Sequence, residues 1–201
     1  MKVLMINGSP NKSGCTYTAL SIVAEALAAE GIESEIVWLG NGPVRDCIGC
    51  GACRKTKNCV FDEDRLSTLK AKCAEADGFI FGSPVYYAHP SGRILSVLDR
   101  LFFSGNAVFK GKPGAAVVSA RRAGTTASVD VLNKYFSISQ MPIVGSSYWN
   151  MVHGSKAEDV LQDEEGVQTM RNLGHNMAAM LKGESLPSAN NTYGSWTCFI
   201  R

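Results

Sequence analysis

The stretch "KVLMINGSPNKSGCTYTAL", residues 2–20, passes from an apolar run through a glycine-framed polar loop into a helical pattern. Residues 2–7 are mostly apolar and end at Gly8, which predicts a short buried strand. From Thr16 to Glu30 apolar side chains recur at helical spacing, and Gly31 offers a C-terminal stop. A strand, a polar loop and a helix in this order predict the first unit of an α/β fold.

The rest of the chain repeats this alternation. Further strands are expected at 33–39, 78–84, 114–120 and 141–146, and further helices at 66–76, 91–103, 125–137 and 157–182. With no internal repeat or long linker, residues 1–201 are expected to form one domain around a doubly wound sheet of five parallel strands. A cysteine-rich loop at 47–59 follows the second strand, and the polar stretch 183–201 is expected to be a C-terminal tail.

The composition is that of an ordinary globular domain with a sizeable core, since 45% of the 201 residues are hydrophobic and 19% are charged. Twenty basic and eighteen acidic side chains give a formal net charge of +2, without a run of like charges. This balance predicts neither nucleic-acid binding nor attachment to an anionic membrane surface. No leader-like or membrane-spanning apolar run stands out, so we expect a cytoplasmic protein whose thiols stay reduced.

Ligands of doubly wound sheets bind at the carboxyl ends of the strands, where the strand order reverses. The loop after the first strand carries hydroxyls and a lysine between Gly8 and Gly14, and a helix begins near Thr16. The free N–H groups and the dipole of a helix N-terminus bind phosphate, so this loop suits a single terminal phosphate. Its glycine spacing matches neither a Walker loop nor a dinucleotide fingerprint. The alternative is a simple helix cap, in which Ser13 or Thr16 bonds the helix's own backbone.

Three further loops are expected at the same edge of the sheet. After the third strand, Tyr86 and Tyr87 could lie against a flat heteroaromatic ring; alternatively, one packs in the core and the other at a subunit contact. After the fourth strand, Arg121 and Arg122 could stabilise negative charge on a ligand or could be ordinary solvated arginines. The loop after the fifth strand adds second-rank candidates, namely Tyr148, Trp149, Asn150 and His153.

Four of the seven cysteines lie between Cys47 and Cys59 with the spacing C-x2-C-x2-C-x5-C. In a reducing compartment this grouping favours metal or redox chemistry over structural disulfides. The spacing differs from that of ferredoxins in its longer last interval and in the missing proline, so all four thiolates could bind one iron–sulfur cluster. Zinc fits less well, because structural zinc sites usually separate two cysteine pairs by a longer hairpin. Reduced or transiently oxidised thiols are the third interpretation.

The segments "MKVLMINGSPNKSGCTYTAL", "CIGCGACRKTKNCVFDED", "ADGFIFGSPVYYAHPSGRILSVLDRLF" and "GKPGAAVVSARRAGTT" together resemble the flavodoxin-like NAD(P)H-dependent FMN reductase family. More narrowly, they are similar to its iron–sulfur flavoprotein-like branch. The resemblance covers nearly the whole chain and implies a flavodoxin-like fold with strand order 2-1-3-4-5 and non-covalently bound FMN. It assigns the FMN phosphate to the first loop, one border of the isoalloxazine to the third-strand loop and the other side to the fourth-strand loop. The implied residues are, in that order, Ser9, Lys12, Ser13, Gly14, Cys15 and Thr16; Pro84, Val85, Tyr86 and Tyr87; and Ser119, Arg121, Arg122 and Gly124.

The resemblance also implies a [4Fe–4S] cluster bound by Cys47, Cys50, Cys53 and Cys59, and a homodimer or homotetramer. The implied activity is hydride transfer from NADH or NADPH to FMN, with onward transfer of electrons to a flavin, a quinone or another small-molecule or protein acceptor. Because the cofactor carries the chemistry, no side chain is assigned as a catalytic acid or base. Two other hypotheses stay open: a flavodoxin-like electron-transfer module without its own NAD(P)H turnover, and a flavin-binding sensor without turnover.

Overall fold

The structure, a computed structural model, describes residues 1–187 and residue 197, and its strands and helices alternate as predicted. In chain order the elements are β1 (Lys2–Asn7), α1 (Cys15–Ala29), β2 (Glu33–Trp38), α2 (Cys53–Thr56), α3 (Leu66–Glu75), β3 (Gly78–Tyr86), β4 (His89–Pro90), α4 (Gly92–Gly105), the 3₁₀ turn η1 (Asn106–Val108), β5 (Gly114–Ala120), α5 (Thr125–Ile138), β6 (Met151–His153), α6 (Ala157–Val160) and α7 (Glu164–Lys182). The predicted tail at 183–201 lies outside the described residues, except for 183–187 and 197.

The strands form one sheet in the order β2-β1-β3-β5-β6, and neighbours along this path are parallel. The short β4 pairs antiparallel with the end of β3 and lies off the path. Counting the parallel strands alone, the order is 2-1-3-4-5, which confirms the prediction. The order reverses at β1, the strand that the phosphate-loop hypothesis concerns.

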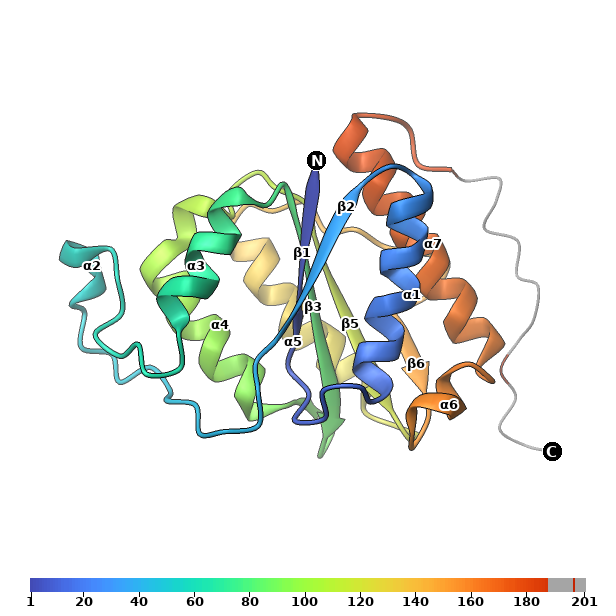
Figure 1. Ribbon diagram of the computed structural model, residues 1–201, viewed down its shortest axis with the longest axis horizontal. Coiled ribbons are helices and arrows are strands. Elements are labelled where there is room, and N and C mark those ends of the chain that lie inside the picture. Colours follow the sequence, from blue (N-terminus) through green and yellow to red (C-terminus); the bar gives the residue numbers. More distant parts are fainter. Residues whose placement is uncertain (188–196, 198–201) are drawn as a thin grey trace.

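Helices cover both faces of the sheet, as Figure 1 shows with the sheet between α1 and α7 on one side and α3, α4 and α5 on the other. The residues of β1 divide between two buried clusters: Val3 and Met5 pack with α1 and α7, while Leu4 and Ile6 pack with α3, α4 and α5. All four are fully buried. This two-sided burial explains why β1 is a continuous apolar run rather than an alternating one.

The predicted strand at 141–146 is wrong. An isolated bridge between Gly114 and Ile143 joins this segment to the start of β5, but the fifth parallel strand is β6, at Met151–His153. Between these two points the chain leaves the sheet as a turn, which the Asn150 side chain stabilises by donating to the Val144 carbonyl at 3.4 Å. The apolar run therefore contacts the sheet at its margin, and the less conspicuous residues that follow form the strand.

The predicted helix at 157–182 is wrong in its first part and confirmed at its end. The chain forms the short α6, breaks, and starts again as α7 at Glu164. Asp163 causes the new start, because its Oδ1 accepts a hydrogen bond from the Gly166 N–H at 3.0 Å and caps the helix. Gly183, with φ 72°, ends α7 in the left-handed conformation that glycine favours.

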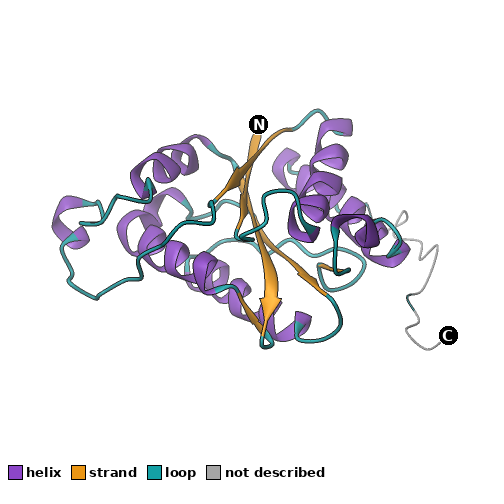
Figure 2. Cartoon of the chain, turned by 60° about the horizontal axis from the view of Figure 1, so that its bottom comes forward, coloured by secondary structure: helices purple, strands orange, loops and turns teal. Residues whose placement is uncertain are grey.

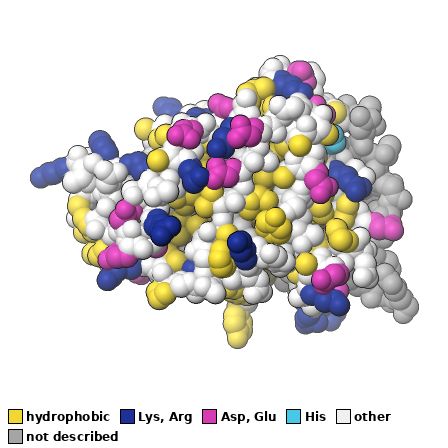
Figure 3. Space-filling model, in the orientation of Figure 1, with side chains coloured by type: hydrophobic (Ala, Val, Ile, Leu, Met, Phe, Trp, Pro, Cys, Tyr) yellow, Lys and Arg dark blue, Asp and Glu magenta, His cyan; other side chains and the backbone are white. Residues whose placement is uncertain are grey.

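The surface carries charges of both signs. On the face shown in Figure 3, lysines and arginines are interspersed with aspartates and glutamates, in keeping with the near-balanced composition. Apolar side chains reach the surface between β2 and α3, where a cavity of about 310 Å³ opens. Among the described residues, no helix combines the length and apolar character needed to cross a membrane.

Candidate flavin and cysteine sites

The loops that follow β1, β3 and β5 meet at the carboxyl edge of the sheet, which lies at the bottom of Figure 1 and is turned toward the viewer in Figure 2. The loop after β1 is held in shape by buried side chains. Asn7, fully buried at the end of β1, accepts from the Ser9 N–H at 3.0 Å and donates to the Lys12 carbonyl at 3.3 Å. From β2, Trp38 donates its indole N–H to the Ser9 carbonyl at 2.8 Å. Side chains of β1 and β2 therefore hold the loop in one shape.

The N-terminus of α1 is left open at the end of this loop. Gly14 is the N-cap, no side chain caps the helix, and the first turn contains no acidic residue. This contradicts the alternative in which Ser13 or Thr16 serves as the cap. Uncapped N–H groups together with the positive end of the helix dipole favour an anion. The exposed Lys12 and Ser13 lie directly before this turn in the chain.

Two other predicted phosphate residues have their side chains engaged elsewhere. The hydroxyls of Thr16 and Ser119 share a buried hydrogen bond of 2.9 Å, which ties α1 to β5. Cys15 donates its thiol to the Gly154 carbonyl at 3.5 Å, and burial raises the pKa of this thiol, so it stays neutral at physiological pH. At these two positions we therefore expect the backbone N–H groups, rather than the side chains, to donate hydrogen bonds to an anion.

Close packing under the loop demands glycine at two positions. A Cβ on Gly8 would lie 2.6 Å from the Ile94 Cβ, and a Cβ on Gly82 would lie 2.8 Å from the Leu20 Cδ1. The Gly8 N–H donates to the Gly82 carbonyl at 2.8 Å, which joins the first loop to β3. The missing side chains therefore let the loop after β1, β3 and the helices come together.

The loop after β3 is a tight hairpin. Val85 pairs with Pro90 and Tyr86 with His89, which leaves Tyr87 and Ala88 as the two turn residues. Both have positive φ, 52° and 60°, a conformation that is unusual for residues other than glycine and asparagine. Such strain is concentrated at functional sites in proteins.

The two tyrosine side chains of this hairpin point to solvent. Tyr86 is 47% exposed and Tyr87 is completely exposed, whereas Pro84 and Val85 are half-buried. The alternative in which one tyrosine packs in the core is therefore wrong. The hairpin presents two exposed tyrosines, and their contact with FMN stays a prediction.

The loop after β5 lies against this hairpin. A Cβ on Gly124 would come within 2.5 Å of the Ala88 Cα, and Gly124 has φ 90°, so glycine is required here. Arg121 and Arg122 are exposed, and α5 begins directly after Gly124 without a side-chain cap. The structure thus brings Gly124 against Val85 and pairs Ser119 with Pro84, while Arg121 and Arg122 lie in the same loop as Gly124.

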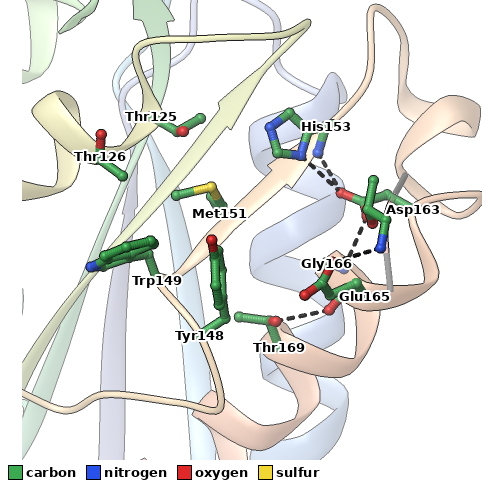
Figure 4. A pocket seen from close by; sticks show the side chains of 11 residues that line it. Thr125, Thr126, Tyr148, Trp149, Met151, His153, Asp163, Glu165, Gly166 and Thr169 are labelled. Carbon is green, nitrogen blue, oxygen red and sulfur yellow. Dashed lines mark hydrogen bonds and ion pairs between the residues drawn. The ribbon is translucent and has the colours of Figure 1, made fainter. Parts of the chain in front are cut away.

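A cavity of about 250 Å³ lies at the same edge, between the start of α5, the segment around β6 and the start of α7 (Figure 4). The rings of Tyr148 and Trp149 meet edge to face, 4.8 Å between centroids, and His153 lines the opposite part of the wall. These three second-rank candidates are therefore at the predicted edge. Asn150 is instead buried and bonded within its turn.

Asp163 organises one wall of this cavity. Its Oδ2 accepts from the His153 backbone N–H at 2.7 Å, and Thr197 donates its hydroxyl to Oδ1 at 2.8 Å. Burial acts to raise the pKa of the Asp163 carboxyl, but hydrogen bonds from His153, Gly166 and Thr197 outweigh it and hold the pKa below its usual value. The charged carboxylate is thus used for structure, as a helix cap and a strand anchor.

The four cysteines of the 47–59 segment are free thiols that line one cavity of about 240 Å³. Cys50 is exposed and Cys47, Cys53 and Cys59 are half-buried, while the short α2, which the sequence did not predict, carries Cys53. Glycines at positive φ, Gly49 and Gly51, let the segment curl around the cavity, as predicted. Among residues 1–187 and 197, no three His, Cys, Asp or Glu side chains are grouped as ligands of a metal ion.

The sequence analysis missed the residues that position the loops after β1 and β3. Ser91 is one: its hydroxyl donates to the Gly8 carbonyl at 2.9 Å, and its N–H donates to the Ser83 hydroxyl at 2.9 Å. It also caps α4 by accepting from the Ile94 N–H. A serine before an apolar helical run predicts a helix cap, so this role of Ser91 could have been predicted. The hydrogen-bond partners of Asn7 and Trp38 could not, because no local sequence pattern indicates them.

Comparison with known proteins agrees with this geometry. Residues 1–156 match the profile of the NADPH-dependent FMN reductase family. An iron–sulfur flavoprotein of Methanocaldococcus jannaschii is 33% identical over 194 residues, which cover 90% of this chain and 98% of that protein. An iron–sulfur flavoprotein of Methanosarcina thermophila is 29% identical over 187 residues, or 90% of this chain and 96% of that protein.

The fold comparison points the same way. A flavodoxin from the domain Archaea has a TM-score of 0.62 at 14% identity, covering 90% of this chain and 99% of its own. At this identity the likeness shows the fold alone. The profile match over most of the chain shows more: the protein belongs to the NADPH-dependent FMN reductase family and is an FMN-dependent oxidoreductase of flavodoxin-like fold.

Proposed function

We propose that this oxidoreductase takes hydride from NADH or NADPH on FMN and passes electrons to a flavin, a quinone or another small-molecule or protein acceptor by way of a [4Fe–4S] cluster. FMN supplies the hydride chemistry when bound, and the cluster would supply single-electron steps. The observation that carries the proposal is the open N-terminus of α1, which faces the edge where the hairpin loop and the β5–α5 loop meet.

The residues of the first loop fit a phosphate monoester. The first turn of α1 has no cap and no acidic residue, the exposed Lys12 adds a positive charge, and the hydroxyl of Ser13 adds a donor. In this proposal the loop holds the phosphate, while the exposed tyrosines of the hairpin and the β5–α5 loop border the ring. Arg121 and Arg122 would then hold negative charge near the ring edge.

Four free thiols that line one cavity support a cluster at the cysteine segment. Four cysteine thiolates are the usual ligands of a [4Fe–4S] cluster, whereas structural zinc sites usually separate two cysteine pairs by a longer hairpin. Cys47, Cys50, Cys53 and Cys59 would be the ligands of the cluster. The names of the archaeal relatives, iron–sulfur flavoproteins, support this part of the proposal.

Anaerobic mixing of the FMN-loaded protein with NADPH or NADH tests the activity. Rapid bleaching of the flavin absorbance is expected with at least one of the two nucleotides. Reduction by a protein donor alone would refute the proposed turnover and favour the electron-transfer module. No reduction by either kind of donor would favour a sensor.

Iron analysis of anaerobically prepared variants tests the cluster. Cys50→Ser should lose iron and keep FMN, while Cys73→Ala should keep both, because Cys73 is fully buried in the core away from the cysteine cavity. Iron that survives Cys50→Ser would contradict the ligand assignment, and wild-type protein without iron would refute the cluster.

A further inference from the structure

A buried arginine forms part of the wall of the cysteine cavity. The cavity lies between the cysteine segment and α4, and α4 contributes Arg100, Phe103 and Ser104 to its lining. Figure 1 shows this segment and α2 beyond α3 and α4, away from the sheet, and α2 packs against α4. The four thiols therefore have a helix side chain of fixed positive charge beside them.

Arg100 is 1% exposed and is the largest fully buried side chain among the described residues. A buried charge is costly unless it is paired and its hydrogen bonds are made. Its guanidinium pairs with Asp64 and donates to the Phe61 carbonyl at 3.4 Å. These bonds attach the chain that follows Cys59 to α4, which is a structural role.

The ion pair of Arg100 and Asp64 does not satisfy all of its own hydrogen-bonding atoms. The Arg100 Nε is buried without a hydrogen-bond partner, and so is the Asp64 Oδ1. An arginine carries five N–H donors, and a buried donor of a charged group that lacks a hydrogen-bond partner destabilises the folded protein. The unpartnered Nε belongs to a side chain that lines the cavity of the four thiols, so the guanidinium charge lies beside any group that binds there.

We propose that Arg100 is the buried counter-charge of the iron–sulfur cluster and that it raises the reduction potential of the cluster; this inference rests on the proposed function. A cluster bound by four thiolates is anionic, and each added electron increases its negative charge. The reduction potential of a cluster depends on its net charge and on the hydrogen bonds to its sulfurs. A guanidinium beside it stabilises the reduced form more than the oxidised form. Asp64 acts in the opposite direction, because it offsets part of the charge of Arg100.

The test is an EPR-monitored redox titration of the anaerobically prepared holoprotein, with iron content measured alongside. Arg100→Gln should shift the midpoint potential of the cluster to more negative values, and Arg100→Lys should restore most of the wild-type potential. Asp64→Asn, which keeps an acceptor for Arg100 but removes the negative charge, should shift the potential to more positive values. Arg54→Gln is the control, because Arg54 lines the same cavity but is exposed, so its charge is screened and the shift should be smaller.

Opposite shifts in Arg100→Gln and Asp64→Asn support the inference, because a purely structural role would impair iron retention in both without a change of sign. An iron-loaded Arg100→Gln with the wild-type potential overturns it while leaving the cluster itself in place. If Arg100→Gln retains no iron, Asp64→Asn decides, and an unchanged or lowered potential overturns the inference. Wild-type protein without iron refutes the cluster of the proposed function and this inference together.

Discussion

An acidic side chain at Ser13 should weaken FMN binding and spare riboflavin binding. Ser13 is exposed, precedes the Gly14 N-cap of α1 and lies beside a first turn without acidic residues. Ser13→Asp therefore places a negative charge where the phosphate is proposed to bind, without disturbing the packing of the core. Ser13→Asn is the matched control, because it has nearly the same shape and no charge.

The magnitude follows from Coulomb's law. Two unit charges about 4 Å apart interact by roughly 1 kcal/mol in water, and a phosphate monoester carries a charge of about −1.5 to −2. Repulsion of roughly 2 kcal/mol raises the Kd by about thirtyfold. The same carboxylate interacts favourably with the dipole of α1, so the apoprotein should gain about 0.3–1 kcal/mol of unfolding free energy. Ligand affinity and stability should thus change in opposite directions.

Fluorescence titration of the apoprotein with FMN and with riboflavin measures these affinities, and urea unfolding measures the stability. The loss of FMN affinity should shrink as salt is added, because the charges are exposed. If Ser13→Asp weakens riboflavin as much as FMN, or binds FMN as Ser13→Asn does, the phosphate does not lie at the N-terminus of α1. The reasoning from the open helix end would then be wrong.

Three further perturbations test the framework around the site. Gly8→Ala should cost about 1–3 kcal/mol of unfolding free energy in a urea titration, because its Cβ would lie 2.6 Å from a carbon of α4, whereas Gly42→Ala, with open space around it, should be nearly neutral. Trp38→Phe removes the indole bond to the Ser9 carbonyl and should cost about 0.5–1.5 kcal/mol as well as FMN affinity; unchanged affinity by fluorescence titration would show that the loop does not need this bond. The pKa of the Asp163 carboxyl is lowered in the folded protein, so this group stabilises the fold above its ordinary pKa of 3.8, and that stability is lost as the pH falls through the folded pKa. In thermal melts at a series of pH values, Asp163→Asn should therefore lose less stability than the wild type below about pH 4. Wild-type and variant stability curves that run parallel would contradict this expectation.

The sequence allowed most of the helices and strands to be predicted, because each must bury an apolar face and the spacing of apolar residues reports that need. The fold class and the position of the loop after β1 are of this kind, whereas the strand order 2-1-3-4-5 was predicted from the family resemblance. The short β6 illustrates the limit. The apolar segment at 141–146 looked like a strand, but the turn fixed by Asn150 carries the pairing with β5 forward to Met151–His153. Pairing across the sheet, rather than local pattern, decided the register.

The candidate site divides in the same way. Glycines, hydroxyls and closely spaced cysteines at strand ends are visible in the sequence, because anion and metal binding need those residue types within a few positions of one another. Trp38, Ser91 and Arg100 were not visible as site residues, because their contacts join positions that lie far apart in the chain. An arginine on an amphipathic helix is ordinarily solvated, and only the packing of the cysteine segment against α4 buries this one beside the thiols. The chain by itself thus determined which elements form and where ligands can bind, whereas the tertiary structure decided which distant side chains support those ligands, since burial and hydrogen-bond partners exist only once the elements have packed.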